Sequence, residues 1–188
     1  MDKQKQKLAL FTSIFIISAI IILLLINNQQ RPSLMPENGF SDVFHDSSAL
    51  IEEIDQLKSQ LRDNPNNYDI LAQIGNHYFD LNQPKNAIEY YERALKIKPD
   101  NPPVLTDCAV MYSQLGYNDK ALEYLDTAIA LKPDLAQAYI NKGVILMTIK
   151  NDVGEAVAVW KKFIEIAPES EHANFLRQQI EAIESNQE

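Results

Sequence analysis

Cysteine and glycine are scarce in this sequence. Cys108 is the single cysteine in 188 residues, so the chain forms no intramolecular disulfide and no cysteine-based metal cluster. It holds five glycines, and outside the N-terminal block Ala, Leu, Ile, Glu, Lys and Gln predominate, a composition that favours helix over sheet. We therefore expect an all-α fold.

Basic charge is also in short supply. The chain has 17 Lys and Arg residues against 26 Asp and Glu residues, a formal net charge of -9. Without residues 1–30, which hold three Lys and one Asp, 14 basic and 25 acidic residues remain and the charge is -11. Because such a surface repels polyanions, we expect no nucleic acid and no anionic lipid surface among its partners.

Residues suited to catalysis or metal binding form no recognisable motif. The three histidines, His45, His77 and His172, lie far apart in sequence, and none is at metal-ligand spacing from Cys108. The sequence has no Gly-rich phosphate loop, nucleophile elbow or HExxH motif. Cys108 falls at an expected core position, where it acts as a small hydrophobe. We predict that the chain is not an enzyme and uses no metal or cofactor.

One long uncharged run stands near the N-terminus. Residues 8–26 read LALFTSIFIISAIIILLLI, and these 19 residues would span roughly 28 Å as a helix, close to the ~30 Å of a bilayer core. Three lysines precede the run and a single arginine, Arg31, follows it, which predicts a cytoplasmic tail at 1–7 and export of the rest.

We expect this run to be an uncleaved transmembrane helix. The alternative is a cleaved signal peptide, whose apolar region usually has only ~7–15 residues and ends at a small-x-small site. The segment NNQQRP that follows the run offers no such site. Length therefore favours the anchor.

A spacer and a first amphipathic helix follow. Residues 27–47 contain two prolines and one glycine and predict an irregular linker. The segment 48–65 ends at Asn64-Pro65. It carries an apolar stripe of Leu50, Ile51, Ile54, Leu57 and Leu61. Because a lone helix of this length is marginal in water, we expect it to cap the structure that follows.

The remaining sequence repeats with a fixed period. Pro65, Pro99, Pro133 and Pro168 are separated by 34, 34 and 35 residues. The period defines a domain at 66–185 that contains repeats 68–101, 102–135 and 136–169 and a closing helix at 170–185. The third repeat holds one extra residue in its central loop. Such a period is typical of helical hairpins that stack on one another.

The same residue types recur at the same places in each period. They are small residues at Gly75, Ala109 and Gly143 and at Ala87, Ala121 and Ala156, and large residues at Tyr91, Leu125 and Trp160. These residues resemble the tetratricopeptide-repeat (TPR) signature. The resemblance implies two antiparallel helices per repeat, with Gly75 facing Ala87. Two residues of the third repeat depart from this signature. Lys142 stands where the first two repeats hold an apolar residue, and Phe163 stands where they hold an alanine.

The resemblance also implies a binding groove, which in TPR arrays is lined by the first helices of successive repeats. Its residues here would be Asn76, Phe79, Asp80, Thr106, Asp107, Val110, Gln114, Ile140, Asn141, Val144 and Met147. An apolar floor toward the third repeat, dotted with amides and carboxylates, suits an extended or helical peptide. Ile140 and Met147 have a second interpretation as ordinary core residues.

One known TPR binding mode does not fit. Chaperone-tail binders hold a carboxylate with Lys, Asn and Arg side chains at positions that correspond to Ala72, Asn76, Asp107, Gln137 and Asn141. Only Asn76 matches, and Asp107 would repel a carboxylate. We therefore exclude that mode.

The order of segments is similar to that of membrane-anchored TPR proteins of bacterial cytochrome c maturation. The similarity covers roughly residues 50–185, from LRDNPNNYDILAQIGNHYFDL to AVAVWKKFIEIAPESEHANFLRQQIEAI. It implies a bacterial inner-membrane protein with its repeats on the extracytoplasmic side, which captures the C-terminal helix of an apocytochrome. The alternative is a scaffold of another envelope complex, which contacts a folded partner through its convex face.

Overall fold

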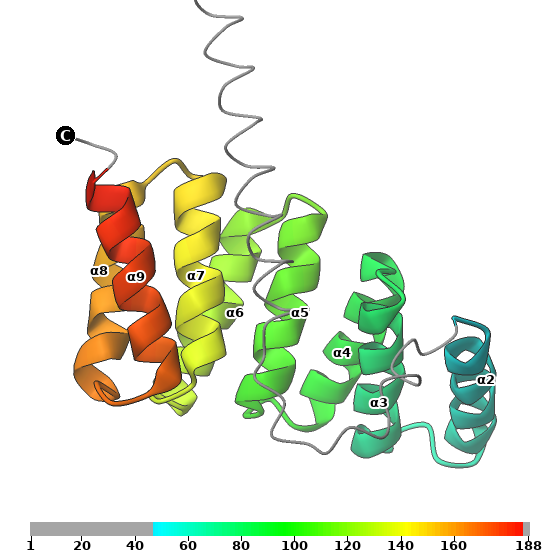
Figure 1. Cartoon of the computed structure of the whole chain (residues 1–188). Helices are drawn as coiled ribbons and strands as arrows, with labels where there is room; N and C mark the ends of the chain where they lie inside the picture. Colours follow the sequence, from blue (N-terminus) through cyan, green and yellow to red (C-terminus); the bar gives the residue numbers. More distant parts are fainter. Residues whose placement is uncertain (1–46, 186–188) are drawn as a thin grey trace, which may run out of the picture. The chain divides into compact units, whose positions relative to one another are not determined.

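The computed structural model describes residues 47–185, which belong to a compact unit at His45–Glu188. This range contains eight α-helices and no strands, which confirms the expected all-α fold for this part of the chain (Figure 1). The helices are α2 (Ser47–Asp63), α3 (Tyr68–Asp80), α4 (Pro84–Ile97), α5 (Pro102–Gln114), α6 (Asn118–Leu131), α7 (Ala136–Thr148), α8 (Val153–Ile166) and α9 (Glu171–Ser185).

The predicted tail, transmembrane helix and linker lie outside the described residues, apart from Ser47, which begins α2. Between residues 47 and 185, no helix is both long enough and apolar enough to cross a membrane.

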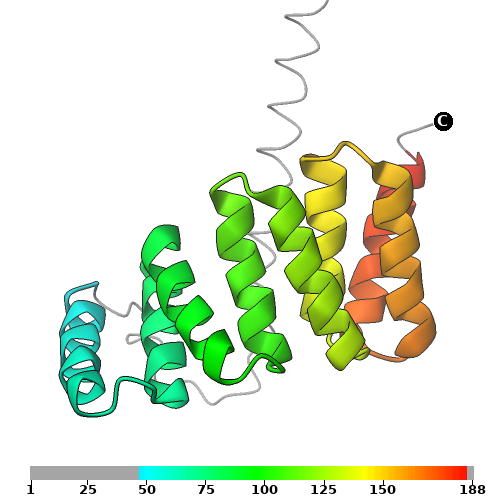
Figure 2. The ribbon, with the colours of Figure 1, turned by 180° about the vertical axis from the view of Figure 1, so that it is seen from behind.

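Consecutive helices pair into hairpins, α3 with α4, α5 with α6 and α7 with α8. The first helices begin at Tyr68, Pro102 and Ala136, one sequence period apart. The second helices α4 and α6 also pack against the first helix of the next hairpin, and α8 packs against α9. Because α3 contacts α5 and α5 contacts α7, the first helices form one layer, and α4, α6 and α8 form the layer seen from behind in Figure 2.

Each hairpin turns through one residue in the left-handed region, where Asn and Gly are favoured. These residues are Asn82, Gly116 and Asn151, with φ of 53°, 83° and 54°. In the first two turns the N–H groups of Gln83 and Tyr117 donate to carbonyls five residues earlier, at 2.8 and 3.0 Å. In the third, the N–H of Asp152 donates to Leu146, six residues earlier, at 2.9 Å. A wider turn thus accommodates the extra residue.

The first and last described helices close the ends of the array. α2 packs on α3 as α4 packs on α5, so it takes the place of the second helix of a preceding repeat. Ile54 and Leu61 are buried against the array, but Ile51 is 50% exposed. The prediction that Ile51 belongs to the buried stripe is therefore wrong, because a single neighbouring helix covers only a narrow strip of α2.

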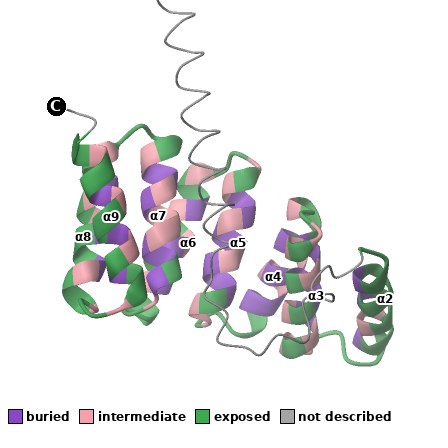
Figure 3. Cartoon of the chain, in the orientation of Figure 1, coloured by how far each residue is buried: buried purple, intermediate pink, exposed green. Residues whose placement is uncertain are grey.

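Buried side chains gather where the helices face one another (Figure 3). One core cluster runs from α2 to α7, and a second joins α7, α8 and α9. Lys142 on α7, which departs from the apolar pattern, is accommodated by charge pairing. Its side chain is only 15% exposed, and its Nζ lies 2.5 Å from Oδ1 of Asp126 on α6.

Glycines on the first helices allow close approach of the second helices. A Cβ added to Gly75 would lie 2.5 Å from Cδ1 of Tyr91, and one added to Gly143 would lie 2.0 Å from Nε1 of Trp160. A Cβ at Gly75 would therefore meet the ring of Tyr91 first.

Candidate functional site

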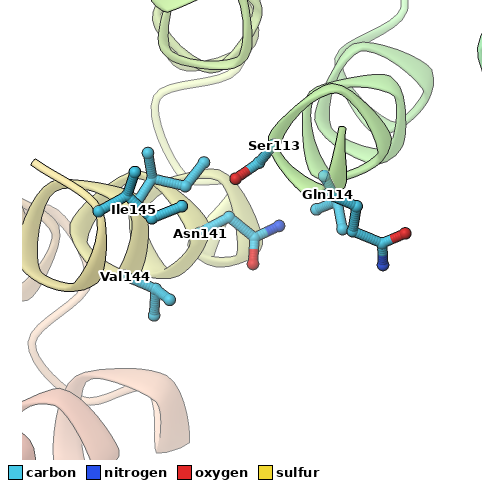
Figure 4. A pocket seen from close by; sticks show the side chains of 7 residues that line it. Ser113, Gln114, Asn141, Val144 and Ile145 are labelled. Atoms are coloured by element: carbon cyan, nitrogen blue, oxygen red, sulfur yellow. The ribbon is translucent and has the colours of Figure 1, made fainter. Parts of the chain in front are cut away.

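A hollow of about 290 Å³ opens between α5 and α7. It is lined by Val110, Ser113, Gln114, Asn141, Val144, Ile145 and Ile149. Figure 4 shows Ser113 and Gln114 on α5 across from Asn141, Val144 and Ile145 on α7. Four groove residues inferred from the sequence, Val110, Gln114, Asn141 and Val144, thus come together around one space.

Polar groups surround the aliphatic lining of this hollow. The Asn141 Oδ1 accepts a hydrogen bond from Gln137 Nε2 at 2.9 Å, and Ser113 Oγ lies 3.2 Å from Asn118 Oδ1. Gln114 is exposed. Amide and hydroxyl groups beside an apolar recess suit a peptide, whose side chain enters the recess while its backbone pairs with the polar groups.

Ile145 and Ile149 also line the hollow, although the groove inferred from the sequence did not include them. Ile145 is 5% exposed and belongs to the first core cluster, so its helical position predicts only a packing role. Ile149 is 47% exposed and follows the last residue of α7. An apolar residue at a turn was the available signal, but helical spacing does not apply beyond the end of a helix.

Asp107 lies on the same face of α5, half-buried and without a hydrogen-bond or ion-pair partner among the described residues. Burial raises the pKa of its carboxyl to about 6, and the nearby carboxylate of Asp80 acts in the same direction. Asp80 is exposed at the last position of α3. The seam between α3 and α5 therefore carries unneutralised negative charge.

Other expected groove residues have structural contacts. Asn76 accepts a hydrogen bond from the Tyr91 hydroxyl at 2.9 Å, which links α3 to α4. Phe79 is half-buried against the first core cluster. Ile140 and Met147 pack against the second cluster, which favours their interpretation as core residues. Val144 both packs there and lines the hollow.

Thr106 does not reach the groove. The residue is 2% exposed, and its hydroxyl donates a hydrogen bond to the Pro102 carbonyl at 2.8 Å. A short side chain that bonds within its own helix is readily covered by neighbouring helices. The assignment of Thr106 to the binding surface is therefore corrected.

The His, Cys, Asp and Glu side chains of the described residues are the candidate ligands of a metal site. Between residues 47 and 185, no three His, Cys, Asp or Glu side chains are placed to hold a metal ion. Cys108 is fully buried, and burial raises the pKa of its thiol to about 12. The thiol therefore stays protonated at neutral pH and is a poor nucleophile.

Comparison with solved structures shows a similar fold in several proteins, two of which are described as TPR proteins. The crystal structure of MamA has a TM-score of 0.61 at 21% identity and covers 70% of this chain and 79% of that chain. A tetratricopeptide repeat protein from Parabacteroides merdae ATCC 43184 has a TM-score of 0.64 at 24% identity. The match covers 75% of this chain and 56% of that chain. YrrB, described as a TPR protein with an unusual peptide-binding site, has a TM-score of 0.62 at 24% identity. The match covers 70% of this chain and 67% of that chain.

Sequence comparison identifies the repeats themselves. No curated protein matches the sequence. Two tetratricopeptide-repeat family models match residues 68–101 and 105–135, which are the hairpins α3–α4 and α5–α6. Residues 68–101 and 105–135 are therefore tetratricopeptide repeats.

Proposed function

We propose that this chain is a protein–protein interaction module, not an enzyme, that holds a segment of a partner polypeptide on the α5–α7 face. The hollow between these helices is the observation that carries the proposal, because two successive repeats build it from aliphatic and amide side chains. The likeness to YrrB supports a peptide as the ligand. A recess of this size accommodates one large side chain of such a segment.

The module is tethered to a membrane in this proposal. Residues 8–26 are the anchor, residues 1–7 remain in the cytoplasm, and the repeats face the extracytoplasmic side of a bacterial inner membrane. Support comes from the uncharged 19-residue run and the lysines that precede it.

The proposed partner is the C-terminal helix of an apocytochrome, which places the chain in c-type cytochrome biogenesis. The order of anchor, linker, repeats and closing helix supports this assignment. An amphipathic helix presents an apolar stripe, and one residue of such a stripe fits the hollow between α5 and α7.

Val144→Asp tests capture in the groove, because it places a charge in the aliphatic wall of the hollow. Fluorescence anisotropy would measure binding of apocytochrome C-terminal peptides to the full chain in a non-ionic detergent. We expect Val144→Asp to weaken binding by at least about tenfold, which corresponds to 1.4 kcal/mol. The control Thr127→Asp adds the same charge at an exposed site on α6 and should leave affinity unchanged. Absence of binding up to millimolar peptide would overturn the cytochrome assignment.

The layer of second helices offers an alternative, a scaffold that contacts a folded partner. Ile97, Leu131 and Ile166 end α4, α6 and α8 and are 42%, 47% and 40% exposed, one repeat apart. A second hollow, of about 330 Å³, lies on this side and is lined by Glu92, Leu95, Lys96, Pro99, Leu105 and Tyr124. The scaffold predicts that Leu131→Asp abolishes a crosslinking pull-down from membranes, whereas Val144→Asp has no effect.

A further inference from the structure

We propose that the segment bound in the groove carries a Lys or Arg side chain that pairs with Asp107 and Asp80, next to the apolar side chain that fills the hollow. This inference rests on the proposed function, since it specifies the ligand of the same groove. It commits to a basic, amphipathic segment of another protein as the occupant.

The arrangement of α5 places the charge and the hollow side by side. Asp107, Val110 and Gln114 are three and then four residues apart, so they lie on one face of the helix. At about 1.5 Å per residue, Asp107 lies about 4.5 Å along the axis from Val110 and about 10 Å from Gln114. A bound segment with an apolar residue in the hollow therefore reaches Asp107 with a basic residue within about two helical turns.

The groove supplies no positive charge of its own to these carboxylates. No Lys, Arg or His among the described residues forms an ion pair with Asp107 or Asp80. The charged neighbour that shifts the pKa of Asp107 is Asp80, which raises it. Asp80 also ends α3, where the partial negative charge of the helix terminus favours a cation over a carboxylate. Both features are unfavourable by themselves, and one bound cation relieves them.

Burial of Asp107 gives this pairing more weight than a surface contact. The carboxyl is half-buried, and burial raises its pKa to about 6, so its surroundings disfavour the ionised form. A positive charge within hydrogen-bonding reach stabilises the ionised form and lowers that pKa. Exposed ion pairs contribute little to affinity, whereas partly desolvated, hydrogen-bonded pairs contribute more.

A selection experiment tests the inference and does not require that the partner be identified. A displayed library of random peptides of about 15 residues, a length that permits a helix, is selected on the full chain in a non-ionic detergent. Peptides that also bind Val144→Asp are then removed. We expect the remaining peptides to share a Lys or Arg within about two helical turns of a large apolar residue.

The outcomes separate the two proposals. Groove-dependent peptides that are neutral or acidic overturn the basic-ligand inference and leave the interaction module standing. If no peptide loses binding on Val144→Asp, peptide capture itself fails, and the inference fails with it.

A double-mutant cycle on the strongest peptide locates the contact. We expect replacement of its Lys by norleucine, or of its Arg by Gln, to weaken binding to the unmodified chain by about tenfold or more. The same replacement should have little effect on binding to Asp107→Asn. Circular dichroism of Asp107→Asn checks that the variant is folded. An equal loss on both forms of the chain would show that the cation binds elsewhere and would overturn the assignment.

Discussion

Gly75 lies against the ring of Tyr91 so closely that a Cβ would be 2.5 Å from two ring carbons, Cδ1 and Cε1. The equivalent pairs are Ala109 with Leu125 in the second hairpin and Gly143 with Trp160 in the third. A glycine thus accompanies an aromatic residue, and an alanine accompanies a leucine. We conclude that the small residue of each first helix is matched in size to the large residue of its second helix.

Gly75→Ala should therefore destabilise the domain, although alanine is the better helix former. Overpacking costs about 1–3 kcal/mol, and the gain in helix propensity offsets up to about 1 kcal/mol. Tyr91 is fully buried and cannot move aside freely. We expect a net loss of about 1–2 kcal/mol in the free energy of unfolding, measured by urea denaturation with circular dichroism.

Two further variants control this experiment. In a Tyr91→Leu background, which recreates the pair of the second hairpin, Gly75→Ala should cost little. Gly154→Ala should be neutral or slightly stabilising, because the nearest atom to its Cβ is 3.7 Å away. An equal cost of Gly75→Ala in both backgrounds would contradict size matching.

Asp107→Asn should stabilise the folded chain at neutral pH. The pKa of Asp107 is raised from the ordinary 3.8 to about 6, so the folded state binds more protons than the unfolded state between these values. The ionised carboxyl therefore lowers the free energy of unfolding. This penalty has its full size above about pH 6 and disappears as the pH falls toward 3.8. The shift sets an upper limit of about 3 kcal/mol, and we expect a gain of about 1–2 kcal/mol.

Urea denaturation at about pH 5 and pH 7.5 would measure this effect. The difference in stability between Asp107→Asn and the unmodified chain should shrink at the lower pH. A difference that does not change with pH would show that the carboxyl is ordinarily solvated. A gain in stability that accompanies a loss of ligand binding is the pattern of a functional residue.

Glu92, Tyr112 and Lys120 form a hydrogen-bonded triad that joins α4, α5 and α6. Lys120 Nζ lies 2.8 Å from Glu92 Oε1 and 2.5 Å from the Tyr112 hydroxyl, which itself donates to Glu92. Although burial alone would raise the pKa of Glu92, the hydrogen bonds from Lys120 and Tyr112 hold it below the ordinary value. The stabilisation is therefore fully present above the ordinary pKa of 4.5 and is lost as the pH falls below it.

A double-mutant cycle with Glu92→Gln and Lys120→Met should reveal a coupling energy of about 0.5–1 kcal/mol near pH 7. The side chains of Lys120 and Glu92 are 43% and 34% exposed, which limits the contribution of the pair. The coupling should weaken as the pH falls below 4.5, because Glu92 becomes protonated. Lys161 and Glu184 form the control pair. Their side chains are 55% and 59% exposed, and the Lys161 Nζ lies 3.2 Å from the Glu184 Oε1, so they should show a smaller coupling energy. A coupling no larger than that of the control would contradict a role in joining the hairpins.

Periodicity predicted the helical hairpins because each repeat needs the same small and large residues where its helices meet. It failed where burial depends on neighbours outside the period. Ile51 shares the stripe of α2 but has no second helix to cover it, and Thr106 holds a groove position but is enclosed by its neighbours. The fold of the described residues was therefore accessible from sequence.

The site was accessible only in part. The TPR resemblance implied Val110 and Val144, but the hollow also needs Ile149, which lies past the end of α7. The burial of Asp107 depends on how closely α3 and α5 approach, and no sequence pattern specifies that distance. The predicted anchor at 8–26 stays a prediction, because it lies outside the described residues.

Tyr139→Phe should leave stability unchanged or raise it. Tyr139 is 1% exposed, and within the part of the chain that the structure describes its hydroxyl has no hydrogen-bond partner. An unsatisfied buried polar group costs about 1–3 kcal/mol, and phenylalanine retains the ring contact with Phe163, whose centroid is 5.4 Å away. Tyr91→Phe is the matched control, because it removes the hydrogen bond to Asn76 and should cost about 0.5–1.5 kcal/mol. In urea denaturation only Tyr91→Phe should therefore lower the free energy of unfolding, and a comparable loss in Tyr139→Phe would show that a buried water satisfies its hydroxyl.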